Sequence, residues 1–149
     1  MPKRTRRHKR FLARHSLSFV VAAIWLLWLV LYQTADPRTH LGAFYGNSIA
    51  DWLGMLTFIV ATKYFFEVGS KESRTPHTHA HQRLLRFVAL HSLTLVVIAT
   101  GVVWVLIFAH TDPESKAGQV YGNIVSEWGQ LLMLIVMTKY FREVGSKES

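Results

Sequence analysis

SLTLVVIATGVVWVLIFA, residues Ser92–Ala109, is a run without a single charged side chain, and residues 16–32 form a second such run. Each run is about as long as the roughly 20 apolar residues with which an α-helix crosses a ~30 Å hydrocarbon core. Residues 47–66 and 123–141 are similarly long, but each carries an acid near its start and a lysine near its end. The sequence therefore predicts an all-α membrane protein with four transmembrane helices.

The second half of the chain repeats the first. A shift of 76 residues aligns residues 10–73 with residues 86–149 without a gap and with 31 identities in 64 positions. Because each unit has two predicted spans, both units are expected to point the same way through the membrane, as parallel-oriented two-helix repeats. The predicted organisation is a basic cytoplasmic tail at 1–9, a first unit at 10–73, a histidine-containing cytoplasmic linker at 74–85 and a second unit at 86–149.

Positive charge is distributed unevenly along the chain. Of the 17 Lys and Arg residues, seven precede the first span, five lie within residues 63–86 and three lie within residues 139–149, which leaves only Arg38 and Lys116 for the other two loops. Basic loops stay in the cytoplasm, so this asymmetry predicts a multi-pass protein of the cell inner membrane with both termini cytoplasmic. Because these basic residues act as a signal for membrane orientation, the net charge of +8 does not require a nucleic-acid partner.

Each unit combines the same short motifs in the same order. A basic residue is followed by His-Ser-Leu at the start of a span, a short outer loop, Trp beside an acid in the next span and a closing Gly-Ser-Lys-Glu-Ser. This pattern resembles a family of small, uncharacterised bacterial two-helix membrane proteins known as a domain of unknown function, here tandemly duplicated. The resemblance covers each unit nearly from end to end, implies a bacterial cytoplasmic membrane and carries no activity to transfer.

Asp51 and Glu127 occupy equivalent positions, so both units keep an acid although its length differs. An ionised acid inside a span is costly unless it is paired or hydrated. One interpretation is a cation or proton site in the outer half of the protein, with further oxygens from Asn47, Asn123 and Gln130. In the competing interpretation the two asparagines cap their helices and the acids lie only about 6 Å further along, where the helix dipole favours negative charge.

His15 and His91 also occupy equivalent positions, each at the cytoplasmic mouth of a span. If a pseudo-twofold axis relates the two units, these histidines would face each other across it. They could then pass protons or bind a metal or haem iron. The alternative is that each histidine lies at the interface and hydrogen-bonds a neighbouring helix.

Two further sets of polar residues lie on the predicted cytoplasmic side. Lys63 and Lys139 are interpreted as lysines that snorkel to the interface, four residues before the acids of the closing motif. In an extended linker, three alternating histidines would point toward one Zn, Ni or Cu ion, with a solvated loop as the alternative. These three histidines are His77, His79 and His81.

No catalytic motif is present in the sequence: it has no phosphate-binding glycine loop, nucleophile elbow or zinc-protease helix, and no cysteine. The leading hypothesis is therefore a non-enzymatic scaffold without a cofactor, in contact with the lipid bilayer and with another membrane protein or a second copy of the chain. The first alternative is a small ion channel or a proton- or cation-coupled carrier that uses Asp51 and Glu127. The second is a membrane haem or metal protein that uses His15 and His91.

Overall fold

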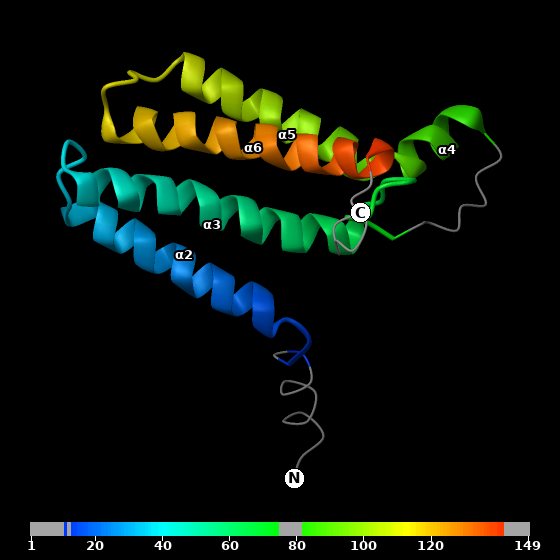
Figure 1. Ribbon diagram of the computed structural model, residues 1–149, viewed down its shortest axis with the longest axis horizontal. Helices are drawn as coiled ribbons and strands as arrows, with labels where there is room; N and C mark the ends of the chain where they lie inside the picture. The colour runs from blue at the N-terminus through cyan, green and yellow to red at the C-terminus, as the bar shows by residue number, and fades with distance from the viewer. Residues whose placement is uncertain (1–10, 12, 75–81, 142–149) are drawn as a thin grey trace, which may run out of the picture.

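The computed structural model describes residues 11, 13–74 and 82–141. Over these residues the chain forms five α-helices, shown in Figure 1. They are α2 (Ser16–Thr34), α3 (His40–Tyr64), α4 (Arg83–Leu90), α5 (Ser92–Ala109) and α6 (Lys116–Tyr140).

Three of the described helices, α2, α5 and α6, are long and apolar enough to cross a membrane, which makes this a helical membrane protein. The prediction of four transmembrane helices was wrong, because α3 does not meet the same criterion of length and apolarity. Helix α3 is 25 residues long, but polar residues such as Asn47 and Asp51 interrupt its apolar sequence. It also buries seven residues, whereas α2 and α5 bury two each, so α3 presents its surface mainly to other helices.

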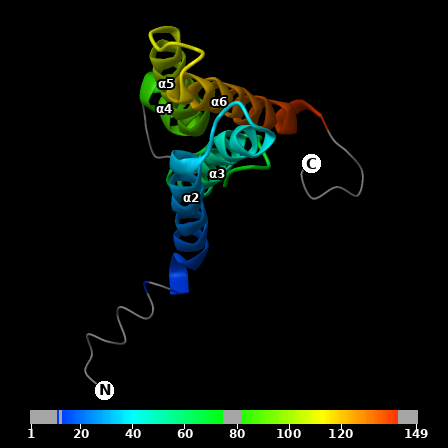
Figure 2. The ribbon, with the colours of Figure 1, turned by 90° about the vertical axis from the view of Figure 1, so that its left-hand side faces the viewer.

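The four long helices lie side by side in the order α2, α3, α6, α5, as the two views in Figures 1 and 2 show. Helix α3 packs on α2 and on α6, and α5 packs on the other side of α6. The short helix α4 contacts α5. The helices form a bundle that is arranged as an open row, with α2 and α5 at its edges.

Helices α3 and α6 begin seven residues earlier than predicted, at His40 and Lys116 instead of residues 47 and 123. Thr39 and Ser115 cap these helices, because each hydroxyl accepts a hydrogen bond from a backbone amide three residues later, at 3.1 and 2.9 Å. The prediction that Asn47 and its counterpart are the caps was wrong. The two Asp-Pro dipeptides form the turns that precede these caps.

Lys116 joins the two units at the end of the row that contains the interhelical loops of both. Its Nζ donates to the backbone carbonyls of Tyr32, Gln33 and Ala35 at 3.3, 3.2 and 2.6 Å, and Tyr32 Oη donates to the carbonyl of Lys116 at 3.1 Å. Carbonyls in the last turn of a helix lack a partner within the helix, so a cation is favourable there. At the opposite end of the row, the segment that follows α3 contacts the end of α6.

Candidate functional site

The contact between α3 and α6, at the centre of the row, brings Asp51 and Glu127 together. Their side chains lie close enough to interact electrostatically. The carboxyl of Glu127 also lies against Gly54, since a Cβ atom at that glycine would be 3.3 Å from Glu127 Oε2. Asp51 is exposed and Glu127 is half-buried, so the pair opens onto the surface of the row.

Both acids lie near the middle of their helices. Asp51 is residue 12 of 25 in α3 (51 − 40 + 1), and Glu127 is residue 12 of 25 in α6 (127 − 116 + 1). At ~1.5 Å per residue, each acid lies about 16 Å beyond the start of its helix. The interpretation that the dipole of the first turn stabilises these acids was wrong, because the effect of the dipole fades within that turn.

The three amide side chains that were expected to supply oxygens lie on neighbouring turns. Asn47 and Asn123 each precede an acid by four residues, and Gln130 follows Glu127 by three. Asn47 and Gln130 are exposed, and Asn123 is half-buried. Their spacing places them on the same helix faces as the acids, but their part in an ion site stays a prediction.

The acid pair has a defined chemical requirement. Two carboxyl groups that lie this close repel each other when both are ionised, so they favour a shared proton or a bound cation. Helices in a membrane offer few other partners for such charge. The pair formed by Asp51 and Glu127 is therefore suited to bind a proton or a cation.

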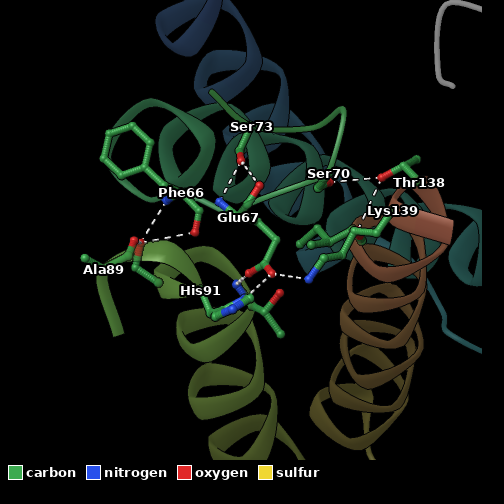
Figure 3. A network of polar contacts seen from close by, with 11 residues as sticks. Phe66, Glu67, Ser70, Ser73, Ala89, His91, Thr138 and Lys139 are labelled. Carbon is green, nitrogen blue, oxygen red and sulfur yellow. Dashed lines mark hydrogen bonds and ion pairs between the residues drawn. The ribbon is translucent and has the colours of Figure 1, made fainter. Parts of the chain in front are cut away.

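A second polar cluster lies at the opposite end of the row from Lys116 and is drawn in Figure 3. Its centre is Glu67, whose side chain is fully buried at 0% exposure. One carboxylate oxygen, Oε1, lies 2.6 Å from Nδ1 of His91 and 2.5 Å from Nζ of Lys139. The other, Oε2, accepts a hydrogen bond from the backbone amide of Thr94 at 3.3 Å. Because an ionised carboxylate only accepts, His91 carries its hydrogen on Nδ1.

Two opposing effects act on the pKa of Glu67. Burial raises this pKa, whereas the hydrogen bonds from Lys139, Thr94 and His91 and the charge of Lys139 lower it, with a net pKa below the ordinary value of 4.5. Glu67 is therefore ionised at neutral pH, as the centre of a buried ion pair.

Serine side chains on both sides hold the segment that carries Glu67, through hydrogen bonds to its backbone. Ser73 Oγ accepts from the amide of Glu67 at 2.6 Å and donates to its carbonyl at 2.9 Å. Ser92 Oγ, at the start of α5, accepts from the amide of Phe66 at 2.8 Å. Gly69 turns the chain with a φ of +84°, a conformation that favours glycine.

The interpretation of the lysines as simple interfacial groups missed this cluster. Glu67 lies beyond the last residue of α3, so it does not form a same-helix pair with Lys63. It reaches instead to Lys139 of the other unit. The sequence did contain a signal for this cluster, because the two closing segments, residues 62–73 and 138–149, differ at only one of 12 positions.

The two histidines have different partners. Nδ1 of His15 lies 2.9 Å from Nζ of Lys63, and Nδ1 of His91 contacts Glu67. They precede α2 and α5, the two edge helices of the row. The interpretation that each histidine bonds a neighbouring segment describes these contacts better, and a haem or metal site shared between them stays a prediction.

Among the residues that the structure describes, no group of three or more His, Cys, Asp or Glu side chains is placed to hold a metal ion. The linker histidines predicted as a metal site, His77, His79 and His81, lie outside the described residues.

These features define the class: a helical membrane protein with a pair of acids at its central helix contact and a buried ion pair at one end. No protein family, curated protein or solved structure matches the chain. The resemblance to bacterial two-helix membrane proteins therefore stays a prediction.

Proposed function

We propose that this protein binds a proton or a cation between Asp51 and Glu127 and passes it across the membrane, as a small channel or an ion-coupled carrier. One observation carries the proposal: two acids from different units lie close together midway along two helices that pack on each other.

A non-enzymatic scaffold is the rival proposal, and it treats the two acids as part of the helix packing. Packing alone does not favour them, since an acid within a membrane is costly unless it is paired or hydrated. Gly54 and Ala50 already allow α3 to approach its neighbours closely, as both are buried. The scaffold proposal therefore leaves the acid pair without a role.

Ion flux in proteoliposomes tests the proposal. In the double variant Asp51→Asn, Glu127→Gln we expect flux to fall to the level of empty vesicles, because neither amide retains a charge to attract a proton or a cation. The measurement follows proton uptake with a pH-sensitive dye, and Na⁺ and K⁺ uptake with ion-sensitive dyes, under an imposed membrane potential.

Glu114→Gln is the matched control for this experiment, because Glu114 is an exposed acid in the α5–α6 loop. This control is expected to keep the flux of the unaltered protein. If the double variant and the unaltered protein gave the same flux above empty vesicles, the acid pair would have no role in transport. If neither exceeded empty vesicles, the scaffold proposal would replace this one.

We further propose that the basic end of the row faces the bacterial cytoplasm, with both termini on that side. Of the 17 Lys and Arg residues, 15 lie before α2, within residues 63–86 or within residues 139–149, and basic segments stay in the cytoplasm. The cluster around Glu67 supports this grouping, since it joins the end of α3, the start of α5 and the end of α6.

A reporter that is active only in the periplasm tests this orientation. We expect no activity when the reporter follows Ser149, and full activity when it is inserted at Pro113, in the α5–α6 loop. Cytoplasmic green fluorescent protein at the same positions is the complementary control, and should fluoresce where the first reporter is silent. Periplasmic activity after Ser149 would overturn the proposed orientation.

A further inference from the structure

An open cavity of about 510 Å³ lies at the end of α3, beside the segment that follows this helix. Its volume is within the range of roughly 300–1,000 Å³ that is typical of sites for small molecules. Asp51, Glu127 and Glu67 do not line it, so the cavity is distinct from the two sites described above. Its lining residues all belong to the described part of the chain and are Ile59, Thr62, Lys63, Lys71, Glu72, Ser73 and Arg74.

The lining of the cavity is positively charged. Its cations are Lys63, Lys71 and Arg74, all of them exposed, and its one acid is Glu72, which gives a net charge of +2 (3 − 1). Nζ of Lys63 also lies 2.9 Å from Nδ1 of His15, a further group that can carry a positive charge. The planar fork of an arginine and the point charge of a lysine are both suited to bind phosphate. The chemistry of the cavity therefore favours a phosphate group as its ligand.

The cavity lies at the level where the chain leaves the membrane. Ser70, which directly precedes Lys71, has its Oγ 3.0 Å from Oγ1 of Thr138 in the last turn of α6, as Figure 3 shows. Helix α6 is long and apolar enough to cross a membrane and ends at Tyr140. Basic side chains beside the end of such a helix reach the level of the lipid headgroups. The phosphate groups of lipids are therefore the ones that this cavity meets directly.

One side of the cavity continues onto the apolar surface of α3. Ile59 lies one turn before Lys63 on the same face of the helix, and Met55 lies one turn before Ile59. Ile59 is half-buried and Met55 is 47% exposed. An acyl chain can lie along this face while the phosphate that it is linked to occupies the charged end. A free phosphate would leave the apolar face unused, so the surface favours a lipid.

We propose that this cavity binds an anionic phospholipid. The phosphate contacts Lys63, Lys71 and Arg74, and one acyl chain lies against Met55 and Ile59. Basic pockets beside transmembrane helices recognise anionic lipid headgroups by this combination of charge and depth. The inference is independent of ion transport, because the acid pair does not line the cavity.

Binding of short-chain phospholipids to the full-length protein in a non-ionic detergent tests the proposal, and native mass spectrometry counts the lipids that stay bound. We expect the protein to retain phosphatidylglycerol in preference to phosphatidylcholine of the same chain length, because only phosphatidylglycerol has a net negative charge. In the double variant Lys71→Gln, Arg74→Gln we expect the affinity for phosphatidylglycerol to fall about tenfold or more, since each cation near the lipid adds to the attraction. Lys63 is kept, because it also contacts His15.

The matched control is Arg83→Gln, Arg86→Gln, which removes the same charge from exposed positions of α4 that do not line the cavity. This control is expected to keep the affinity of the unaltered protein. An equal loss in both double variants would show that the lipid responds to overall charge alone, and would overturn the proposal. Equal retention of phosphatidylglycerol and phosphatidylcholine by the unaltered protein would also overturn it.

Inorganic phosphate distinguishes a lipid from a free anion as the ligand. We expect phosphate at the concentration of the lipid to leave phosphatidylglycerol bound, because it makes no contact with the apolar face of α3. Displacement of the lipid under these conditions would identify a site for free phosphate and would contradict the proposed lipid site.

Photolabelling of the unaltered protein keeps the proposal testable if the double variant fails to fold. Phosphatidylglycerol with a photoreactive diazirine on its acyl chain should label the peptide that contains Met55 and Ile59 more strongly than the matching phosphatidylcholine does. Other lipid-facing peptides, such as those of α2 and α5, should be labelled equally by both lipids. Equal labelling at Met55 and Ile59 as well would overturn the proposal.

Discussion

Replacing Glu67 with glutamine is expected to lower the free energy of unfolding by about 3–5 kcal/mol, the cost of breaking a buried ion pair from one side. The side chain is completely buried, and Lys139 and His91 are 18% and 25% exposed. The amide keeps the shape of the acid but leaves the ammonium of Lys139 without a counter-charge. Unfolding in mixed detergent micelles, followed by circular dichroism, measures the change.

Glu114→Gln is the control for this variant, because it removes an exposed acid in the α5–α6 loop. A surface replacement of this kind changes stability by less than about 0.5 kcal/mol. If Glu67→Gln were as stable as this control, the buried pair would contribute nothing to the fold and the α3–α5 connection would be held by its backbone contacts alone.

The pH dependence of the same variant has a defined sign. The pKa of Glu67 lies below its ordinary value of 4.5 in the folded protein, so the unfolded chain takes up the proton first as the pH falls. The stabilisation is complete above the unfolded pKa and is lost as the pH falls through the lower, folded pKa. The stability difference between the unaltered protein and Glu67→Gln should therefore be constant near neutral pH and shrink below about 4.5.

The largest non-additive effect is expected at the central acid pair. Either Asp51→Asn or Glu127→Gln converts two acids into an acid and an amide, which removes the repulsion and the need for a shared proton or cation. The second replacement then has little left to change. The two effects on the free energy of unfolding should therefore differ from their sum by more than about 1 kcal/mol, within the range known for groups in contact.

The pair Asp51→Asn, Glu114→Gln is the control for this cycle, because Glu114 lies in a loop away from the central contact. Its two effects should add to within about 0.5 kcal/mol, as for independent sites. Additivity at Asp51 and Glu127 as well would show that the two acids do not share a proton or a cation, and would favour the scaffold.

The depth of the acids shows where prediction from sequence was limited. Asn47 has the residue type of a helix cap, so the sequence pattern favoured a helix that begins there. The competing cap at Thr39 directly follows the Asp36-Pro37 turn, and it was the cap that the chain used. Because α3 begins seven residues earlier than expected, Asp51 lies in the middle of the helix, beside Glu127, and not in the first turns where the helix dipole would stabilise its charge.

The count of membrane spans failed for a related reason. The sequence pattern treated residues 47–66 as a span of the same kind as 123–141 because the two segments are equivalent in the repeat. Hydropathy separates them, since α6 qualifies as a span and α3 does not. The position of α3 between two other helices explains why its sequence can include small and polar residues, because much of its surface contacts protein.

By itself, the sequence determined the all-helical class and the apolar helices. It also determined which segments carry the positive charge and which residues, 76 positions apart, are equivalent. Each of these follows from residue type and spacing along the chain. Only the tertiary structure decided which equivalent residues meet. Asp51 meets Glu127, whereas His15 and His91 each meet another partner, and Glu67 reaches across to Lys139. The reason is that these contacts depend on the order of the helices in the row and on where α3 ends, and neither follows from hydrophobic periodicity.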